Sequence, residues 1–187
     1  QSLERTLYMA RKRAERLISQ TLGDEAIDFY ICSMSGSTIC YKGMFLAPQL
    51  FGYYPDLSNR ETESSLAMVH QRYSTNTFPN WKLAQPFRMI AHNGEINTLS
   101  GNANRMRSRE GLLDCELLGR DLTDLAPILT PGTSDSAQFD NAVELLVRSG
   151  RSLPHAMMMM IPEAFGPSYH ISTDKRAFYE YHAAIME

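Results

Sequence analysis

The chain has 187 residues, of which 43% are hydrophobic and 21% are charged, and its formal net charge is −3. This length fits one domain or a large piece of one, and the composition is that of a globular protein rather than a disordered or fibrous one. The slight negative charge gives no support to nucleic-acid binding. No apolar run approaches the roughly 20 residues of a membrane-spanning helix.

The first predicted element is a helix over residues 3–20, where apolar side chains recur every three or four positions before Gly23. Its other side is basic, through Arg11, Lys12, Arg13 and Arg16. A solvent-facing helix surface is the simpler interpretation of this basic side, and a patch for an anionic partner is the alternative.

Three stretches in the first half predict β-structure. Residues 27–45 contain two β-rich runs around Ser35-Gly36-Ser37, which is a hairpin signal. Residues 64–74 and 86–96 are short apolar runs flanked by polar clusters, which favours buried strands over helices. Because loops rather than helices connect these runs, we expect an antiparallel sheet with helices layered on it, an α+β fold.

The second half predicts helices. Residues 134–150 show a polar cap, a periodic apolar face and Gly150 as the stop, and residues 97–113 are compatible with a helix. Residues 152–165 start as a short helix and continue into a buried segment, whereas residues 169–185 fit a helix or a strand equally well.

The cysteines and histidines give no sign of a metal site. Cys32, Cys40 and Cys115 make an odd count without CxxC spacing, which argues against zinc or a disulfide framework and suits a reducing compartment. Their apolar surroundings favour inert thiols. The five histidines show neither an HExxH motif nor paired metal spacing, so we expect no bound metal.

Two apolar runs end abruptly on polar residues. The first, in "AMVHQRYSTNT", ends near Arg72, whose guanidinium can grip a carboxylate through two parallel N–H donors; a salt bridge or a surface arginine is the simpler alternative. The second, in "RMIAHNGEINTLSGN", ends at Asn93-Gly94. A hairpin turn is the simple interpretation there, and an oxyanion hole built from the Asn amide and the Gly N–H is the functional one.

Asp135 opens the helix predicted over residues 134–150. Its spacing to Gln138 resembles a capping box, so helix capping competes with binding of an ammonium group, and the pattern does not separate the two. Taken together, a guanidinium, a carboxylate and two oxyanion donors describe a site for an α-amino acid that carries a side-chain carbonyl.

The stretch "LAMVHQRYSTNTFPNWKLAQPFRMIAHNGEINTLSGN" closely resembles the class II glutamine amidotransferase region of the glutamate synthase large chain. The segments "FGYYPDLS", "TPGTSDSAQFDNAVELL", "SLPHAMMMMIPEAF" and "YHAAIME" resemble it too, so the likeness covers essentially the whole chain. It implies a four-layer α/β/β/α sandwich of the N-terminal-nucleophile type. Residues 1–187 would form an incomplete part of one such domain, without its first strands, its nucleophile segment and its C-terminal end.

The same resemblance implies roles for individual residues. Arg72 matches the arginine that binds the glutamine α-carboxylate, Asn93 and Gly94 match the oxyanion-hole pair, and Asp135 matches the aspartate that holds the α-ammonium. The family's nucleophile is an N-terminal cysteine whose own α-amino group activates the thiol. Because the chain begins at Gln1, we expect that cysteine upstream, and we expect the isolated chain to be inactive and, with uncovered sheet edges, poorly stable.

The family also implies what happens to the ammonia that glutamine hydrolysis releases. It passes to a separate domain that binds FMN and an iron–sulfur cluster, where 2-oxoglutarate is reductively aminated with electrons from NADPH, NADH or ferredoxin. We expect no cofactor in residues 1–187, and glutamine and the other domains of the polypeptide as partners. The expected location is the cytoplasm, or the plastid for a plant-type protein, with no membrane and no nucleic acid involved.

Two alternatives stay open beside this interpretation. One is the glutaminase domain of a different class II amidotransferase, in which short linkers would surround the arginine and Asn-Gly motifs; the insert "TNTFPNWKLAQPF" speaks against it. The other is a glutamine-binding module without catalytic activity.

Overall fold

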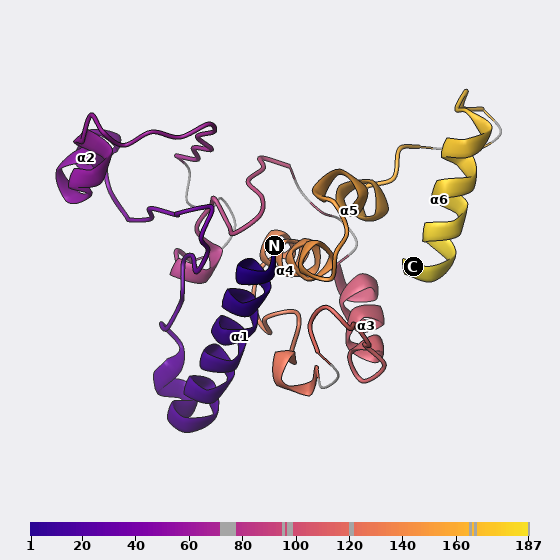
Figure 1. Cartoon of the computed structure of the whole chain (residues 1–187), viewed down its shortest axis with the longest axis horizontal. Helices are drawn as coiled ribbons and strands as arrows, with labels where there is room; N and C mark the ends of the chain where they lie inside the picture. Colours follow the sequence, from indigo (N-terminus) through magenta and orange to yellow (C-terminus); the bar gives the residue numbers. More distant parts are fainter. Residues whose placement is uncertain are drawn as a thin grey trace.

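The structure, a computed structural model, describes residues 1–71, 78–94, 96, 99–119, 122–164, 166 and 168–186. In this part of the chain, helices are joined by extended segments and short 3-10 turns (Figure 1). The α-helices are α1 (Ser2–Leu22), α2 (Leu50–Tyr53), α3 (Leu99–Glu110), α4 (Asp135–Arg148), α5 (Leu153–Met160) and α6 (Thr173–Met186).

The helices predicted from local signals are confirmed. Helix α1 ends where Gly23 takes a positive φ of 54°, and its amide returns to the carbonyl of Ser19. Helix α4 begins after Ser134, whose hydroxyl accepts a hydrogen bond from the Ala137 amide at 3.2 Å. Gly150 follows α4 with a φ of 108°. The stretch that fitted helix and strand equally is helix α6.

The predicted α+β architecture, a four-layer α/β/β/α sandwich, is wrong. The residues that the structure describes contain no strand, and the β-pairing they show is an isolated antiparallel bridge between Cys115 and Gly119. A strand exists only when the backbone of a neighbouring strand pairs with it. In the predicted strand over residues 86–96, the amides of Met89 and Ile90 donate instead to a side chain of α4, the carboxylate of Asp140.

The buried strand predicted over residues 64–74 is also wrong for the residues of this run that the structure describes. Its apolar side chains were expected in the core, yet Leu66 and Val69 are 78% and 82% exposed. An apolar run buries its side chains only where another layer packs on it, and sequence periodicity does not report whether that layer is present.

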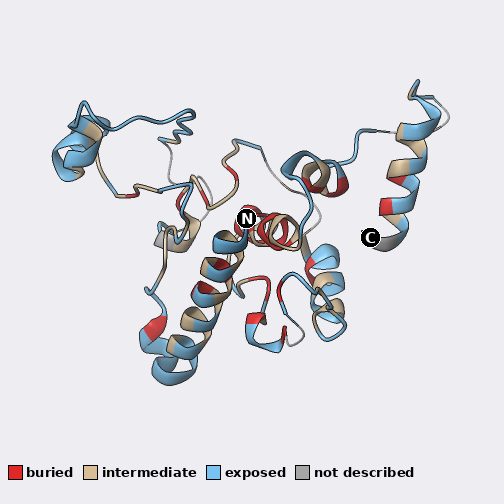
Figure 2. Ribbon diagram, in the orientation of Figure 1, coloured by how far each residue is buried: buried red, intermediate tan, exposed pale blue. Residues whose placement is uncertain are grey.

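The core surrounds α4. Figure 1 shows α1 and α3 flanking α4, and Figure 2 shows that buried residues gather on α4 and on the loop beside it. The main cluster draws apolar side chains from α1, α3, α4 and the 118–129 segment: Tyr8, Ala103, Leu118, Leu122, Leu125, Ile128, Leu129, Ala142 and Leu145. A smaller cluster of Phe87, Ile90 and Ala137 packs the 87–90 segment onto the first turn of α4.

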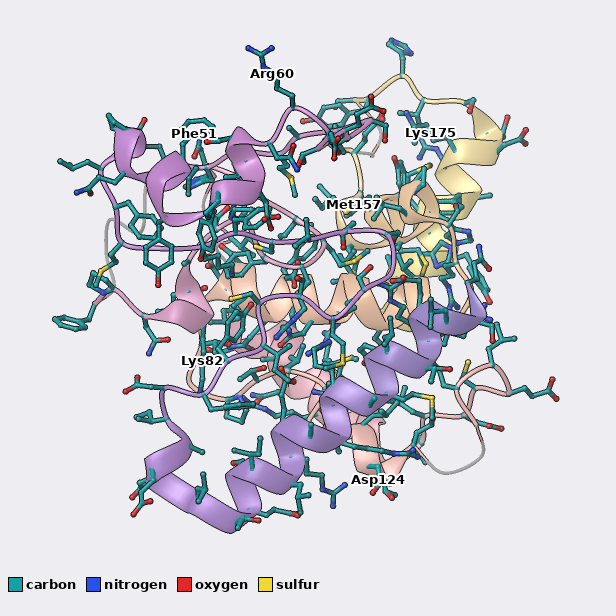
Figure 3. All side chains as sticks on the ribbon, turned by 60° about the vertical axis from the view of Figure 1, so that its left-hand side comes forward. Phe51, Arg60, Lys82, Asp124, Met157 and Lys175 are labelled. Carbon is teal, nitrogen blue, oxygen red and sulfur yellow. The ribbon has the colours of Figure 1, made fainter. Side chains whose placement is uncertain are left out.

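The basic side of α1 faces the protein more than solvent. Arg11 pairs with Glu144 of α4, and the Lys12 ammonium donates to the Pro127 carbonyl at 2.6 Å. Asp124, labelled in Figure 3, pairs with Arg16 and with the more exposed Arg13. Most of these cations bind α4 or the loop that contains Asp124 and Pro127. The predicted roles, a solvated surface or a patch for an anionic partner, therefore do not describe them.

Candidate functional site

A cavity of about 750 Å³ lies between α3, α4, α5, α6 and the 89–96 segment. Its volume is in the range of sites that bind small molecules. The wall is mainly apolar, with Met68, Met89, Met106, Met157, Met159 and Met160 contributing much of it. Among the polar groups on the wall are His92 and Asp135, so the cavity reaches the residues that the sequence marks for chemistry.

Helix α4 holds the 88–96 segment at three points along its length. The Asp140 carboxylate accepts hydrogen bonds from the Met89 amide at 2.7 Å and the Ile90 amide at 3.0 Å. Further toward the N-terminus of α4, the Ser136 hydroxyl lies 2.6 Å from Nε2 of His92. At the first residue of α4, Asp135 accepts a hydrogen bond from the Ile96 amide at 3.0 Å.

Asp135 lies inside the helix and does not cap it, because Ser134 is the capping residue. One carboxylate oxygen accepts from the Ile96 amide, and the other accepts from the amide of Ser136 at 2.6 Å and from its hydroxyl at 2.9 Å. A carboxylate has about four acceptor positions. One position is therefore left for a further donor.

These contacts also set the charge state of Asp135. Burial works to raise its pKa, but hydrogen bonds from the Ile96 and Ser136 amides outweigh burial, and the pKa lies below its ordinary value. Asp135 is consequently an anion at neutral pH, as a partner for an ammonium group must be.

Asn93 and Gly94 form an exposed bend rather than a tight hairpin turn. A type I′ turn needs positive φ angles at both central residues, and neither residue has one. The Asn93 side-chain oxygen lies 2.9 Å from Nε2 of His70, and the Gly94 amide donates to Nδ1 of His92 at 3.1 Å.

The structure thus joins Gly94 to Asp135 through His92 and Ser136 beside the cavity, although 41 positions separate Gly94 from Asp135 in the sequence. Asn93 precedes Gly94 in the same bend, and its side chain contacts His70. Arg72 lies outside the described residues. Sequence reasoning missed Ser136 and Asp140. The signal for Asp140 was available, since a carboxylate interrupts the apolar face of the predicted helix between Phe139 and Ala142.

Asp140 is 1% exposed, and its pKa is shifted in the opposite direction from that of Asp135. Burial raises the pKa of Asp140 to about 6 from its ordinary value of 3.8, against the hydrogen bond from the Met89 amide, which favours the ionised form.

The three cysteines lie away from the cavity wall and are half-buried free thiols. Burial raises the pKa of Cys40, which makes its thiolate scarcer. Among the described residues, no three histidine, cysteine, aspartate or glutamate side chains gather as metal ligands. In the same residues, no helix is long and apolar enough to cross a membrane.

Comparison with known proteins assigns the chain to a family. The whole chain, residues 1–187, matches the family model described as "Glutamine amidotransferases class-II". The chain is 46% identical over 187 residues to the large chain of the NADPH glutamate synthase of Azospirillum brasilense. It is 50% identical over 185 residues to the NADH glutamate synthase of Schizosaccharomyces pombe and 48% identical over 187 residues to the ferredoxin-dependent enzyme of Pyropia yezoensis.

These alignments cover 98% to 100% of the chain but only 8% to 12% of the relatives. The chain therefore corresponds to a small part of each of these proteins.

Proposed function

Since the chain belongs to the class-II glutamine amidotransferase family, we propose that it is part of the glutaminase domain of a glutamate synthase. That domain hydrolyses glutamine to glutamate and ammonia, and other domains of the polypeptide use the ammonia to make glutamate from 2-oxoglutarate. The observation that carries the proposal is the joining of Asp135 to the Asn93-Gly94 bend beside one cavity.

Each end of the glutamine molecule has a partner in this proposal. The free acceptor position of Asp135 takes the α-ammonium group, and the guanidinium of Arg72 takes the α-carboxylate as a bidentate pair. When a thiolate attacks the side-chain amide carbon, the carbonyl oxygen becomes an oxyanion. The Asn93 side-chain amide and the Gly94 N–H then stabilise that charge by donating hydrogen bonds to the oxyanion.

The nucleophile in this proposal is a cysteine of the same polypeptide outside residues 1–187, because none of the three cysteines here lines the cavity. The α-amino group of that cysteine takes the thiol proton and passes it to the amide nitrogen, so that attack of the thiolate releases ammonia and leaves a glutamyl thioester, which water hydrolyses to glutamate.

We assign FMN, the iron–sulfur cluster and the electron donor to other domains of the polypeptide. The support is that relatives named for NADPH, NADH and ferredoxin match this region about equally, at 46%, 50% and 48% identity. A region that determined the electron donor would be expected to differ between these groups.

The role of Arg72 is tested by Arg72→Ala in the full-length protein. Loss of a charge-assisted pair with the α-carboxylate should raise KM for glutamine roughly tenfold to hundredfold, with glutamate formation from added ammonia unchanged. Steady-state assays with each nitrogen source give both values. An equal fall in the two activities would show that Arg72 supports the fold rather than glutamine binding.

The role of Asn93 is tested by Asn93→Ala. Loss of one oxyanion donor should lower kcat for glutamine hydrolysis roughly 10²- to 10³-fold, with a smaller effect on KM. Asn104→Ala, on the exposed side of α3, is the matched control and should leave kcat unchanged. If kcat survives Asn93→Ala, the Asn93-Gly94 bend is only a connection between elements.

A further inference from the structure

A directed chain of hydrogen bonds runs from Gly94 to Asp135 through two side chains. The Gly94 amide is 3.1 Å from Nδ1 of His92, Nε2 of His92 is 2.6 Å from the Ser136 hydroxyl, and that hydroxyl is 2.9 Å from the Asp135 carboxylate. An amide N–H can only donate, so Nδ1 of His92 must accept and carries no proton. The neutral ring then has its proton on Nε2 and donates it to Ser136, whose own proton goes to Asp135.

The Gly94 N–H already donates its hydrogen bond to His92, so it is not free to donate to an oxyanion. Catalysis requires that His92 release it. The other end of the chain is Asp135, the carboxylate to which the preceding proposal assigns the substrate α-ammonium group.

An ammonium group brings three donors to a carboxylate that already accepts three hydrogen bonds. One of them takes the free acceptor position on the oxygen that binds the Ile96 amide, and a second competes with the Ser136 hydroxyl for the other oxygen. Once displaced, this hydroxyl can turn and donate to Nε2 of His92. The ring then gives up its Nε2 proton to water and takes one from water at Nδ1, so its total number of protons is unchanged, and an Nδ1–H no longer accepts from Gly94.

We propose that His92 masks the Gly94 amide until an α-ammonium group binds Asp135, and that Ser136 couples the two events. The proposal rests on the roles assigned above to Gly94 and Asp135, and it adds a reason for substrate specificity. Amides that lack an α-amino group would find the oxyanion hole incomplete. His92 and Ser136 are positioning residues in this scheme, since neither touches the reacting amide.

The surroundings of His92 favour a movement of the ring over a movement of the whole segment. On one side, Met89 and Ile90 are held by Asp140, and on the other side Ile96 is held by Asp135. Ser136 itself is buried in the first turn of α4. With the backbone fixed on both sides, rotation or tautomer exchange of the ring is the small change that frees Gly94.

The test compares two amides in the full-length protein: glutamine, and glutaramate, which is glutamine without its α-amino group. In the unchanged protein, kcat for glutaramate should lie well below kcat for glutamine. Ser136→Ala removes one hydrogen bond that holds His92 in the masking position. It should raise kcat for glutaramate relative to kcat for glutamine by roughly twofold to tenfold, the value of one hydrogen bond. KM for glutaramate should stay high, since no ammonium is present.

Ser134→Ala is the matched control, because Ser134 lies in the same turn and its hydroxyl caps α4 without contacting His92 in this structure. It should leave the ratio of the two kcat values unchanged. His92→Phe keeps a ring of similar shape without the acceptor and should raise the ratio as Ser136→Ala does, which covers the case in which Ser136→Ala does not fold.

An unchanged ratio in the folded Ser136→Ala or His92→Phe protein, or an equal change in Ser134→Ala, overturns the masking role. The proposed function is tested separately by Asn93→Ala, because that experiment measures kcat for glutamine alone. The masking role can therefore fail while the proposed function stands.

Discussion

Asp140 shows at the scale of one residue how burial and hydrogen bonding oppose each other. Its carboxylate is almost fully enclosed, yet it orders the backbone that leads to His92 through the amides of Met89 and Ile90. Burial nevertheless dominates and raises its pKa to about 6. The residue that anchors the candidate site is therefore partly protonated in mildly acidic solution.

The raised pKa predicts a pH dependence of stability. Between pH 4 and pH 6 the folded chain holds the Asp140 proton and the unfolded chain does not, so the free energy of unfolding falls as pH rises through this window. A difference of two pKa units corresponds to about 3 kcal/mol. Urea unfolding of the chain at several pH values should show this fall relative to Asp140→Asn. Parallel curves for the two proteins would contradict the assignment.

At the scale of elements, α1 and α4 are joined by a buried charge pair. Arg11 and Glu144 approach to 2.5 Å with side chains that are 3% and 6% exposed, and Glu15 also contacts Arg11 at 2.9 Å. A charge in such a position is tolerable only while its partner is present. The docking of the first helix onto the central one consequently depends on this pair as well as on the apolar contacts of Tyr8.

Removing one partner should cost more than removing both. Arg11→Met leaves the Glu144 carboxylate buried and unpaired, and we expect it to lower the free energy of unfolding by about 3–5 kcal/mol. The double variant Arg11→Met with Glu144→Met should recover much of that loss, because no unpaired charge is left. Urea unfolding of the three proteins measures the difference. Additive losses in the double variant would show that packing, not charge pairing, sets the cost.

The helices and the missing strands show which elements a sequence can predict. Helix α4 follows from Ser134, the apolar face and Gly150, which are all signals within one helix length. A strand depends on backbone partners from elsewhere, so the apolar run over residues 86–96 was mistaken for one. In the candidate site, the roles of Arg72, Asn93, Gly94 and Asp135 come from the family resemblance and stay predictions. The contact of His92 with Ser136 was not predicted, because it joins residues 44 positions apart.

At the scale of the whole molecule, buried side chains are concentrated around α4, and the 27–71 region extends away from it. Figure 2 shows that α2 and its neighbouring segments are largely exposed. This region displays large apolar side chains, among them Ile39, Met44, Leu46, Leu66 and Val69. Exposed apolar groups in such number are typical of surfaces that contact other protein segments. We therefore expect low stability of the isolated chain because of these exposed apolar side chains, and not because of the uncovered sheet edges predicted from the sequence.

The spacing of the contacts on α4 also determines the shape of the segment beside it. Asp135 and Asp140 are five residues apart, about 7.5 Å along the helix axis, while the six Cα-to-Cα steps from Ile90 to Ile96 would span roughly 20 Å if extended. A path that is much longer than the distance between its fixed ends must arch outward. Asn93 and Gly94 lie between His92 and Ile96, which are both tied to the first turn of α4, and the excess length of chain leaves these two residues exposed.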